Sequence, residues 1–364
     1  MSATDERYMS LALALGRRGL GRVWPNPAVG CVIVQGARIV GRGWTQDGGR
    51  PHAEVVALAQ AGDAAKGATA YVSLEPCNHV GQTGPCSQAL IDAGIARVVV
   101  AITDPDPRVS GAGLARLEEA GIAVTRDVLA LQALADQVGF LHRVTLGRPM
   151  VTLKLASSFD GRIATGSGQS QWITGPQARR RVHALRAAHD AVMVGAGTVR
   201  HDDPSLTVRD LGIDRQPVRI AVSRRLDLPL MSNLARSARD IPVWICHGHD
   251  ADANLRSTWE GLGARLFSCD AHGGHLDMRA VLEALAAEGL TRIFCEGGGM
   301  LAASLLDGGL VDQLVGFTAG IGIGAEGLPA IGAMGLSHLQ DAPRFTLRDV
   351  TPVGPDIMHV WTRA

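Results

Sequence analysis

The sequence predicts two α/β domains that meet near residue 147. Its 364 residues exceed one typical domain, and an apolar content of 46% with 45 glycines suits sheets and helices joined by tight turns. Helical and strand-like segments alternate in two blocks, and the second block starts after Thr145-Leu146-Gly147-Arg148-Pro149. We therefore place the domains at 1–146 and 147–364, with a linker over 143–149.

The first block begins with a helix and two strands, which are followed by alternating helices and strands. Amphipathic spacing predicts helices over 5–18 and 52–60, and Pro85 at the start of a helical run predicts a third over 86–92. A final helix–strand–helix passage ends near Phe140. Strand-like runs cover 29–34, a segment ending near Trp44, 70–74 and 97–102. This order predicts a three-layer α/β/α sandwich.

The second block opens with a strand over 150–155 and a turn over 157–162. Lys154 ends that apolar strand, an unusual place for an unpaired charge, which indicates a contact with a ligand or a salt bridge. Helical stretches separate the later strands, so we predict a second α/β domain. These strands are expected near 190–195, 217–222, 242–246, 291–295 and 311–318.

Charge and hydropathy argue against several classes of protein. Lys+Arg and Asp+Glu both number 35, so no overall field favours nucleic acid or an anionic membrane. No apolar run approaches the roughly 20 residues that a membrane span needs. The polar, acidic start, Met1 to Arg7, is unlike a secretory signal. We therefore expect a cytoplasmic protein with reduced cysteines, and the sequence leaves a homo-oligomer open.

Three residues have the types and spacing of a catalytic zinc site. His52, Cys77 and Cys86 offer one imidazole and two thiols, and Glu54 lies two residues after the histidine. Three protein ligands leave the fourth position of Zn²⁺ open for water, whereas structural sites usually close with a fourth protein ligand. Zinc lowers the pKa of a bound water to roughly 7, and Glu54 is placed to move protons rather than to bind metal. Such a set is typical of zinc-dependent base deaminases.

The residues alone leave other interpretations open. His79 could close a structural zinc site, although such a site does not need Glu54, or His52 could be a capping or core histidine beside inert cysteines. A nucleic-acid base deaminase would want a basic channel and stacking aromatics, and this chain is neutral with two tyrosines. A non-enzymatic binding module stabilised by zinc is the remaining alternative.

Two glycine-rich turns in the second block could hold a phosphate. Gly297, Gly298 and Gly299 follow a strand and open a helix, where backbone N–H groups attract an anion such as a dinucleotide pyrophosphate. The segment 194–200 offers a competing Gly-x-Gly, but Arg200 stands where the Rossmann fingerprint has its third glycine. Either segment could also be only a tight turn.

Taken together, the motifs resemble those of a known family. Eight residues separate Cys77 from Cys86, unlike the common Pro-Cys-x-x-Cys signature. The first block carries Pro25-Asn26-Pro27-x-Val29-Gly30, His52-Ala53-Glu54 and Glu75-Pro76-Cys77-x₈-Cys86. The second carries 154–162, 170–174, Asp202-Asp203-Pro204-x-Leu206-Thr207-x-Arg209 and Glu296-Gly297-Gly298-Gly299. In this order, and over nearly the whole chain, they are similar to the bifunctional riboflavin-biosynthesis deaminase/reductases.

The resemblance implies a cytidine-deaminase-like first domain that holds Zn²⁺ and a dihydrofolate-reductase-like second domain that uses NADPH. By this similarity, the first domain would deaminate 2,5-diamino-6-ribosylamino-4(3H)-pyrimidinone 5′-phosphate. The second would reduce the ribosyl group of the product to ribityl, with the hydride chemistry carried by the cofactor. The implied partners are small pyrimidine ribosyl phosphates rather than nucleic acid or a membrane.

The resemblance also assigns residues of this chain to ligands. Arg186 and Arg209 suit a ribose phosphate because guanidinium binds phosphate bidentately, although from the residues alone they could be ordinary solvated arginines. Positions expected to contact the cofactor are Ser157, Trp172, Thr198, Asp202, Gly298, Gly299, Met300, Leu301, Ala302, Ala303 and Ser304. Positions expected to contact the substrate are Asn26, Lys154, Ser170, Arg186, Leu206, Arg209 and Glu296.

Two positions of the first domain depart from the family's pattern. Thr45 stands where a histidine is expected, and Gln82 where a lysine or arginine is expected. Losing a charge-assisted hydrogen bond there could weaken substrate binding by roughly 1–3 kcal/mol. Because the zinc ligands and Glu54 are intact, we still predict an active deaminase, with Arg50 or His79 compensating.

Overall fold

The structure is a computed structural model that describes residues 2–78, 84–106 and 110–364. The chain divides into two compact units, Met1–Gly147 and Arg148–Ala364, so the division falls one residue after the expected one. Among the helices of these described ranges, none is both long and apolar enough to cross a membrane.

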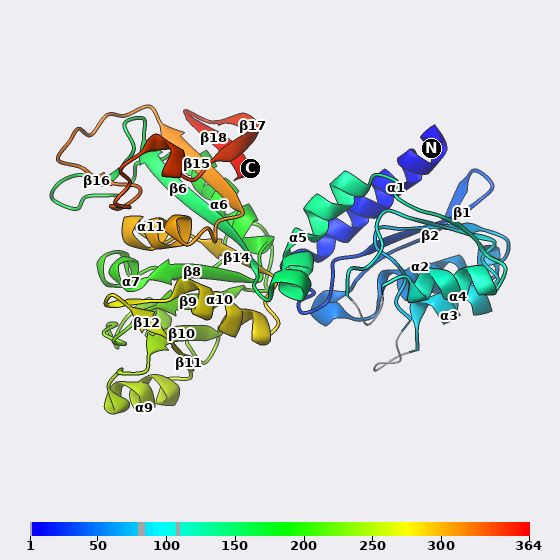
Figure 1. The fold of residues 1–364 in the computed structure, drawn as a ribbon, viewed down its shortest axis with the longest axis horizontal. Helices are drawn as coiled ribbons and strands as arrows, with labels where there is room; N and C mark the ends of the chain where they lie inside the picture. The colour runs from blue at the N-terminus through cyan, green and yellow to red at the C-terminus, as the bar shows by residue number, and fades with distance from the viewer. Residues whose placement is uncertain (1, 79–83, 107–109) are drawn as a thin grey trace. The chain divides into compact units, whose positions relative to one another are not determined.

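The first unit is a five-stranded sheet covered by helices on both faces, as Figure 1 shows. The strand order is β2-β1-β3-β4-β5, with β1 antiparallel to its neighbours and β3, β4 and β5 parallel. Helices α1 and α5 lie on one face, and α2, α3 and α4 lie on the other (Figure 1). The elements are α1 Ala3–Gly16, β1 Gly30–Gln35, β2 Arg38–Trp44, α2 Ala53–Ala61, β3 Thr69–Val72, α3 Cys86–Asp92, β4 Arg97–Val100, α4 Ala112–Glu119, β5 Ala123–Thr125 and α5 Ala130–Leu146.

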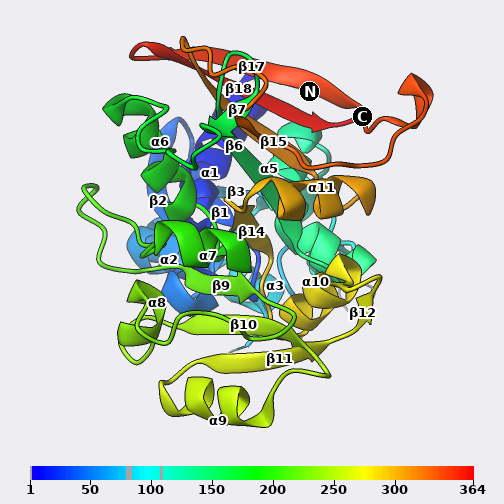
Figure 2. The same cartoon turned by 90° about the vertical axis from the view of Figure 1, so that its left-hand side faces the viewer.

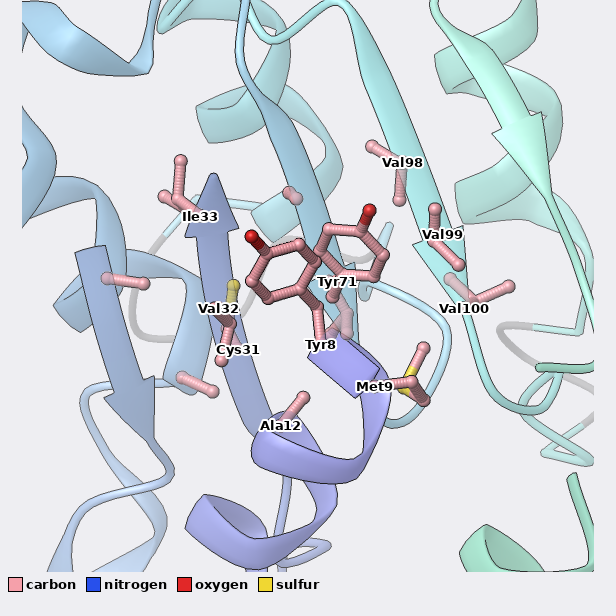
Figure 3. Packing of buried hydrophobic residues seen from close by; sticks show 14 of the residues in the cluster. Tyr8, Met9, Ala12, Cys31, Val32, Ile33, Tyr71, Val98, Val99 and Val100 are labelled. Carbon is pink, nitrogen blue, oxygen red and sulfur yellow. The ribbon is translucent and has the colours of Figure 1, made fainter. Parts of the chain in front are cut away.

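Apolar side chains are buried on both faces of this sheet, and one part of this core lies between α1 and the sheet. The side chains of α1 face β1, β3 and β4, and the rings of Tyr8 and Tyr71 lie 5.2 Å apart (Figure 3). Small and β-branched residues dominate, which suits close packing of a helix on a sheet. The labelled members in Figure 3 are Tyr8, Met9, Ala12, Cys31, Val32, Ile33, Tyr71, Val98, Val99 and Val100.

A buried carboxylate ties α1 to the sheet. Asp5 accepts hydrogen bonds from the Tyr71 hydroxyl and from two guanidinium nitrogens of Arg97, each at 3.0 Å. The hydrogen bonds from Arg97 outweigh burial and lower the pKa of Asp5. Asp5, in the polar first segment of the chain, is therefore part of the folded domain.

The second unit is built on a nine-stranded sheet with the order β11-β10-β9-β8-β14-β6-β15-β18-β17. The strands from β11 to β15 are parallel, and β18 and β17 continue the sheet as an antiparallel hairpin at the end opposite β11 (Figure 2). The elements are β6 Met150–Ser158, β7 Arg162–Ala164, α6 Pro176–Ala187, β8 Ala191–Gly195, α7 Ala196–Asp202, β9 Val218–Val222, α8 Asn233–Arg236, β10 Val243–Gly248, α9 Ala253–Gly261, β11 Arg265–Cys269, β12 Ala271–His272, β13 His275–Leu276, α10 Met278–Ala287, β14 Arg292–Cys295, α11 Gly299–Asp307, β15 Gln313–Ala319, β16 Leu328–Pro329, β17 Phe345–Val353 and β18 Asp356–Arg363.

Three features differ from the sequence-based expectations. The linker placed at 143–149 is wrong in its first half, because α5 continues to Leu146 and ends where Gly147 adopts a φ of 67°. Strand β6 continues to Ser158, so Lys154 lies within a strand rather than at its end. The edge strand β11 and the hairpin β17–β18 were not expected. In β17 most residues are exposed, and the alternation of apolar and polar residues breaks where the register shifts, between Leu347 and Asp349.

A buried ion pair lies at the start of the second unit. Arg148 donates to both carboxylate oxygens of Asp312 at 2.7 Å, and the Val151 N–H donates to the same carboxylate at 2.8 Å. Both side chains of the pair are only 9% exposed. The pair therefore joins the beginnings of β6 and β15, which are neighbouring strands of the large sheet.

Replacing Arg148 should destabilise this unit because it leaves a buried carboxylate without its guanidinium. We expect Arg148→Met to lower the free energy of opening β6 and β15 by about 3 kcal/mol, measured by hydrogen exchange and mass spectrometry on peptides from these strands. Arg200→Met is the matched control, since the Arg200–Asp227 pair is exposed by 41% and 56% and should change little. Equal effects of the two substitutions would contradict this account.

Candidate active sites

The first candidate site lies where three segments reach one edge of the first sheet. Strands β2, β3 and β4 point the same way, because β1 is antiparallel to β2 and β3 while β3 and β4 are parallel. His52 is the N-cap of α2, which follows β2, and Cys77 follows β3. Cys86 is the first residue of α3, which leads back to β4. The expectation that His52 lies inside the first helical turn is thus corrected by one position.

The donor atoms of these residues are spaced for one metal ion. His52 Nδ1 lies 3.3 Å from Cys86 Sγ and 3.6 Å from Cys77 Sγ, and all three atoms fall within 4.8 Å of one another. A tetrahedral zinc with ordinary Zn–N and Zn–S bonds would separate its nitrogen and sulfur ligands by about 3.6 Å. The residues therefore fit zinc. Within the described ranges, His52, Cys77 and Cys86 are the His, Cys, Asp or Glu side chains that lie close enough together in a group of three to hold a metal ion.

The surroundings of the two thiols favour a thiolate. A hydrogen bond with the Cys86 thiol, together with contacts from His52 and the Cys86 backbone N–H, lowers the pKa of Cys77 to about 4. The same shared hydrogen bond and burial raise the pKa of Cys86. His52 has a raised pKa, chiefly through its hydrogen bond with Cys77. Because a metal ion binds thiolates, this arrangement favours the binding of a metal cation.

Glu54 is buried beside the three ligands, with only 3% of its surface exposed. Burial first, and then the nearby charge of Cys77, raises its pKa to about 7. A carboxyl group with such a pKa can both accept and return a proton near neutral pH, which is what a general acid–base needs. The expected division into three ligands and one proton carrier therefore has a geometric basis.

Of the two positions that depart from the family's pattern, the structure describes Thr45 but not Gln82. Thr45 is buried, and its hydroxyl accepts a hydrogen bond from the Val29 N–H at 3.0 Å, so it fixes the start of β1. Asn26 donates from its side chain to the Gly49 carbonyl at 3.3 Å. Arg50 lies close enough for its charge to act on His52. Gln82 and His79 lie outside the described residues.

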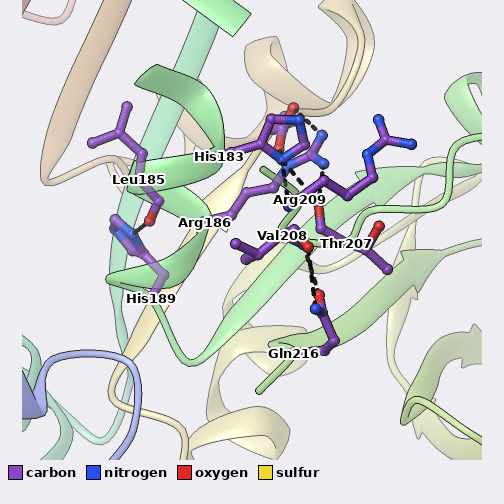
Figure 4. A network of polar contacts seen from close by, with 9 residues as sticks. His183, Leu185, Arg186, His189, Thr207, Val208, Arg209 and Gln216 are labelled. Carbon is purple, nitrogen blue, oxygen red and sulfur yellow. Dashed lines mark hydrogen bonds and ion pairs between the residues drawn. The ribbon is translucent and has the colours of Figure 1, made fainter. Parts of the chain in front are cut away.

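The second candidate site gathers charged groups at the carboxyl edge of the large sheet. Arg186, on α6, donates to the Thr207 carbonyl at 2.7 Å (Figure 4). It also donates to both carboxylate oxygens of Glu296, at 2.5 and 3.0 Å. Glu296 directly follows β14 and is nearly buried, and its pKa is lowered because Arg186 outweighs the effect of burial. The pair thus joins α6, β14 and the loop after α7.

Lys154 lies beside this pair. In the register between β14 and β6, Cys295 is opposite Leu153, so Glu296 and Lys154 are neighbours at the ends of that pairing. Burial lowers the pKa of Lys154, while the charges of Glu296 and Asp202 act in the opposite direction. Lys154, Glu296, Asp202 and Arg186 therefore form one charged cluster, and all four were expected ligand contacts.

Both glycine-rich turns named from the sequence lie side by side. Strands β8 and β14 are neighbours, and a Cβ placed on Gly298 would lie 3.6 Å from the Thr198 hydroxyl. Helices α7 and α11 begin there with Gly195 and Gly298 as N-caps. The first turns of both helices thus offer N–H groups at one place, which suits a diphosphate better than either turn alone.

The remaining expected cofactor positions are unequally accessible. Trp172 is 67% exposed with Arg179 stacked 4.6 Å from its ring centre, and Met300 is 63% exposed. Ser157 and Ser170 are half-buried. Ser304 uses its hydroxyl on the Met300 carbonyl, and Leu301, Ala302 and Ala303 are buried in the core. Within the run from Gly298 to Ser304, Met300 is therefore the exposed residue, and Gly298, Gly299 and Ser304 are half-buried.

The loop that carries the last two expected substrate residues is firmly held. Leu206 is buried in the core at a φ of 54°, so any contact it makes with a ligand would come from its backbone. Arg209 is exposed, and its N–H donates to His183 Nδ1 at 3.3 Å. Gln216 bonds both the N–H and the carbonyl of Val208, at 2.7 and 3.1 Å (Figure 4).

Sequence reasoning missed His183 and Gln216, which support this loop without any motif of their own. His183 lies one helical turn before Arg186, a spacing that puts both on one face of α6. Gln216 carries no sequence signal. Side chains that act by holding backbone are found only once the fold is known.

Comparisons with known proteins identify the family of both units. Residues 2–102 match the family model of the cytidine and deoxycytidylate deaminase zinc-binding region, and residues 149–359 match that of the RibD C-terminal domain. The riboflavin biosynthesis protein RibD of Escherichia coli (strain K12) is 42% identical, and the match covers 97% of this chain and 98% of that protein.

The chain belongs to the RibD family.

Solved RibD structures share the fold along the whole chain. Acinetobacter baumannii RibD (form 1) is similar with a TM-score of 0.89, 37% identity and 99% of both chains covered. A diaminohydroxyphosphoribosylaminopyrimidine deaminase/5-amino-6-(5-phosphoribosylamino)uracil reductase from Thermotoga maritima gives a TM-score of 0.87 at 33% identity, again covering 99% of both chains. The cytidine-deaminase-like first domain and the reductase second domain predicted from the sequence are thereby confirmed.

The charged cluster of the RibD reductase domain should depend on the pair between Arg186 and Glu296. We expect Arg186→Met to lower the kcat/KM of reduction by about a hundredfold, because Glu296 would lose its partner and the Thr207 carbonyl its donor, which displaces the loop. Deaminase activity, measured on the same sample, should not change. Arg180→Met, an exposed arginine on the same helix, is the control. Reduction at wild-type rate in Arg186→Met would refute this role.

Proposed function

We propose that this chain catalyses two consecutive steps of riboflavin biosynthesis. The first is the hydrolytic deamination of 2,5-diamino-6-ribosylamino-4(3H)-pyrimidinone 5′-phosphate, and the second is reduction of the ribosyl group by NADPH to give 5-amino-6-ribitylaminouracil 5′-phosphate. The observation that carries the proposal is the coexistence of both sites in a chain that matches RibD proteins along nearly their full length.

In the deaminase site, His52, Cys77 and Cys86 would hold zinc. When bound, the metal supplies the Lewis acidity that makes water a nucleophile near neutral pH. Glu54 would take one proton from that water at its carboxylate and pass it to the ring nitrogen; it would then take the proton that the attacking oxygen still carries and pass it to the departing amine, which leaves as ammonia. Its burial supports this role, because a carboxyl group with a pKa of about 7 exchanges protons readily in both directions. Asn26 would contact the pyrimidine substrate.

In the reductase site, NADPH would supply the hydride, and the protein's task is to bind and orient. The adjoining turns around Thr198 and Gly298 support a place for the diphosphate, and the exposed rim residues Trp172 and Met300 would flank the cofactor. The other assigned cofactor positions, Ser157, Asp202 and the remainder of the run to Ser304, belong to the same proposal.

Substrate binding in this site would use the charged cluster and the loop beside it. Lys154 and Glu296 would contact the ribosyl group, and Arg209, which is exposed, would bind its phosphate through the guanidinium. Arg186 would act mainly through Glu296, because its guanidinium is already committed to that carboxylate and to Thr207. Ser170 and the backbone of Leu206 complete the assignment.

We further propose that the deaminase is active although Thr45 and Gln82 replace the residues expected there. Arg50, whose charge acts on His52, is the described residue that we assign to compensate for a missing cation. Arg50→Ala would then raise the KM of deamination by about tenfold, since a charge-assisted hydrogen bond contributes roughly 1.5–3 kcal/mol. Reduction should not change, and an unaltered KM for deamination would count against the compensation.

The direct test supplies the diaminopyrimidine ribosyl phosphate together with NADPH. We expect stoichiometric release of ammonia, followed by oxidation of NADPH that depends on that release. Supplying the deaminated intermediate should give NADPH oxidation without ammonia. If either signal fails to depend on the pyrimidine, the proposed pair of reactions is wrong.

Glu54→Ala separates a catalytic zinc centre from a structural one. Deamination should fall by at least a thousandfold while zinc content and reduction of the supplied intermediate stay at wild-type values, because Glu54 carries protons and does not ligate the metal. Glu118→Ala, an exposed carboxylate on α4, is the control. Loss of zinc or of folding in Glu54→Ala would favour a structural zinc module instead.

A further inference from the structure

The long separation between the two cysteine ligands raises a structural question. In a Pro-Cys-x-x-Cys signature, one turn of chain fixes both thiols, whereas here eight residues separate Cys77 from Cys86. Helix α4, which supplies no metal ligand, contacts the segments on both sides of this gap. Two side chains, Glu75 and Arg116, make these contacts.

Glu75 joins the Cys77 segment to the start of α4. Its buried carboxylate accepts hydrogen bonds from the N–H groups of Gly111, Gly113 and Leu114, at 3.0, 2.9 and 3.3 Å, and from Asp104 at 3.1 Å. The N-cap of α4 is Gly111, which has no side chain to cap the helix. Glu75 therefore replaces the missing cap from a distant point in the sequence.

The first turn of α4 also touches the peptide just before Cys77. A Cβ placed on Gly113 would lie 2.0 Å from the Pro76 carbonyl oxygen, so only glycine lets the helix approach this closely. The Pro76 carbonyl therefore lies directly against the first turn of α4, beside the Glu75 carboxylate that caps this helix. The chain immediately before Cys77 is thus packed on α4.

Arg116, one turn further along α4, joins both cysteine segments. Its guanidinium donates to Asn78 Oδ1 at 3.1 Å and also to Gln88 Oε1. Asn78 follows Cys77 directly, and Gln88 lies in the first turn of α3, which begins at Cys86. Ser87 adds a hydrogen bond to the same Asn78 oxygen at 2.9 Å. A single guanidinium therefore spans the two sides of the gap.

We propose that Glu75 and Arg116 are positioning residues that set the spacing of the Cys77 and Cys86 thiols through α4. In the Cys-x-x-Cys signature a short turn fixes the relative positions of the two cysteines; here, across a gap of eight residues, α4 has that role. Holding the thiols apart at the distance a metal needs lowers the ordering cost of binding, so zinc should be bound more tightly and released more slowly. This inference rests on the proposed zinc site.

The test compares zinc release from the full-length zinc-loaded protein to an excess of a coloured chelator. Glu75→Gln keeps the shape of the side chain but turns an amide N–H₂ toward two of the bonded N–H groups, and Arg116→Met removes the bridge. We expect each variant to release zinc at least tenfold faster than wild type. The cobalt-substituted variants should also show a shifted ligand-field band, which a change in stability alone would not produce.

Glu118→Gln and Arg126→Met are matched controls, since these residues form an exposed pair and should leave zinc release unchanged. Reductase activity reports that the second unit is intact. Should Glu75→Gln fail to fold, Arg116→Met and the milder Arg116→Lys decide alone. Release rates within twofold of wild type in both arginine variants, with unshifted cobalt spectra, overturn the inference. His52→Ala binding zinc as tightly as wild type would instead overturn the zinc site itself.

Discussion

Three ligand atoms from three separate segments meet because their segments all reach the same edge of one sheet. Strands β2, β3 and β4 share a direction, so the N-cap of α2, the end of β3 and the start of α3 converge there. Both helix N-termini favour negative charge, and Cys86 is the first residue of one of these helices. The deaminase chemistry depends on this convergence, since none of the segments could hold a metal alone.

In the second unit, too, the candidate site residues converge at one edge of a sheet, although the chemistry is different. Its parallel strands β6, β8 and β14 deliver Lys154, the Thr198 turn and Glu296 to one edge of the sheet, where ligands of open α/β sheets bind. Arg186 neutralises Glu296 and holds the loop after α7 at the same time. A charged cluster that is paired internally can stay ordered before any substrate arrives, which is what binding of a ribosyl phosphate requires.

Much of this could be predicted from sequence because the signals were local. The residue types and spacing of His52, Glu54 and both cysteines predicted the metal site, and short apolar runs predicted most of the parallel strands, although not β11. The hairpin β17–β18 was not predicted, because strand 345–353 is mostly exposed and its alternation of apolar and polar residues is broken at the register shift after Leu347. The supporting roles of Glu75, Arg116, His183 and Gln216 could not be predicted either. Their partners are backbone groups or polar side chains that lie 8 to 39 positions away.

The central claim is that zinc is held by three protein ligands with one position left for water. Crystals of the zinc-loaded protein, measured on both sides of the zinc absorption edge, test it most directly through an anomalous difference map. We predict a single peak bounded by His52 Nδ1, Cys77 Sγ and Cys86 Sγ, with a non-protein oxygen in the fourth position facing Glu54. A fourth protein side chain on the metal, or a zinc peak elsewhere, would contradict the account.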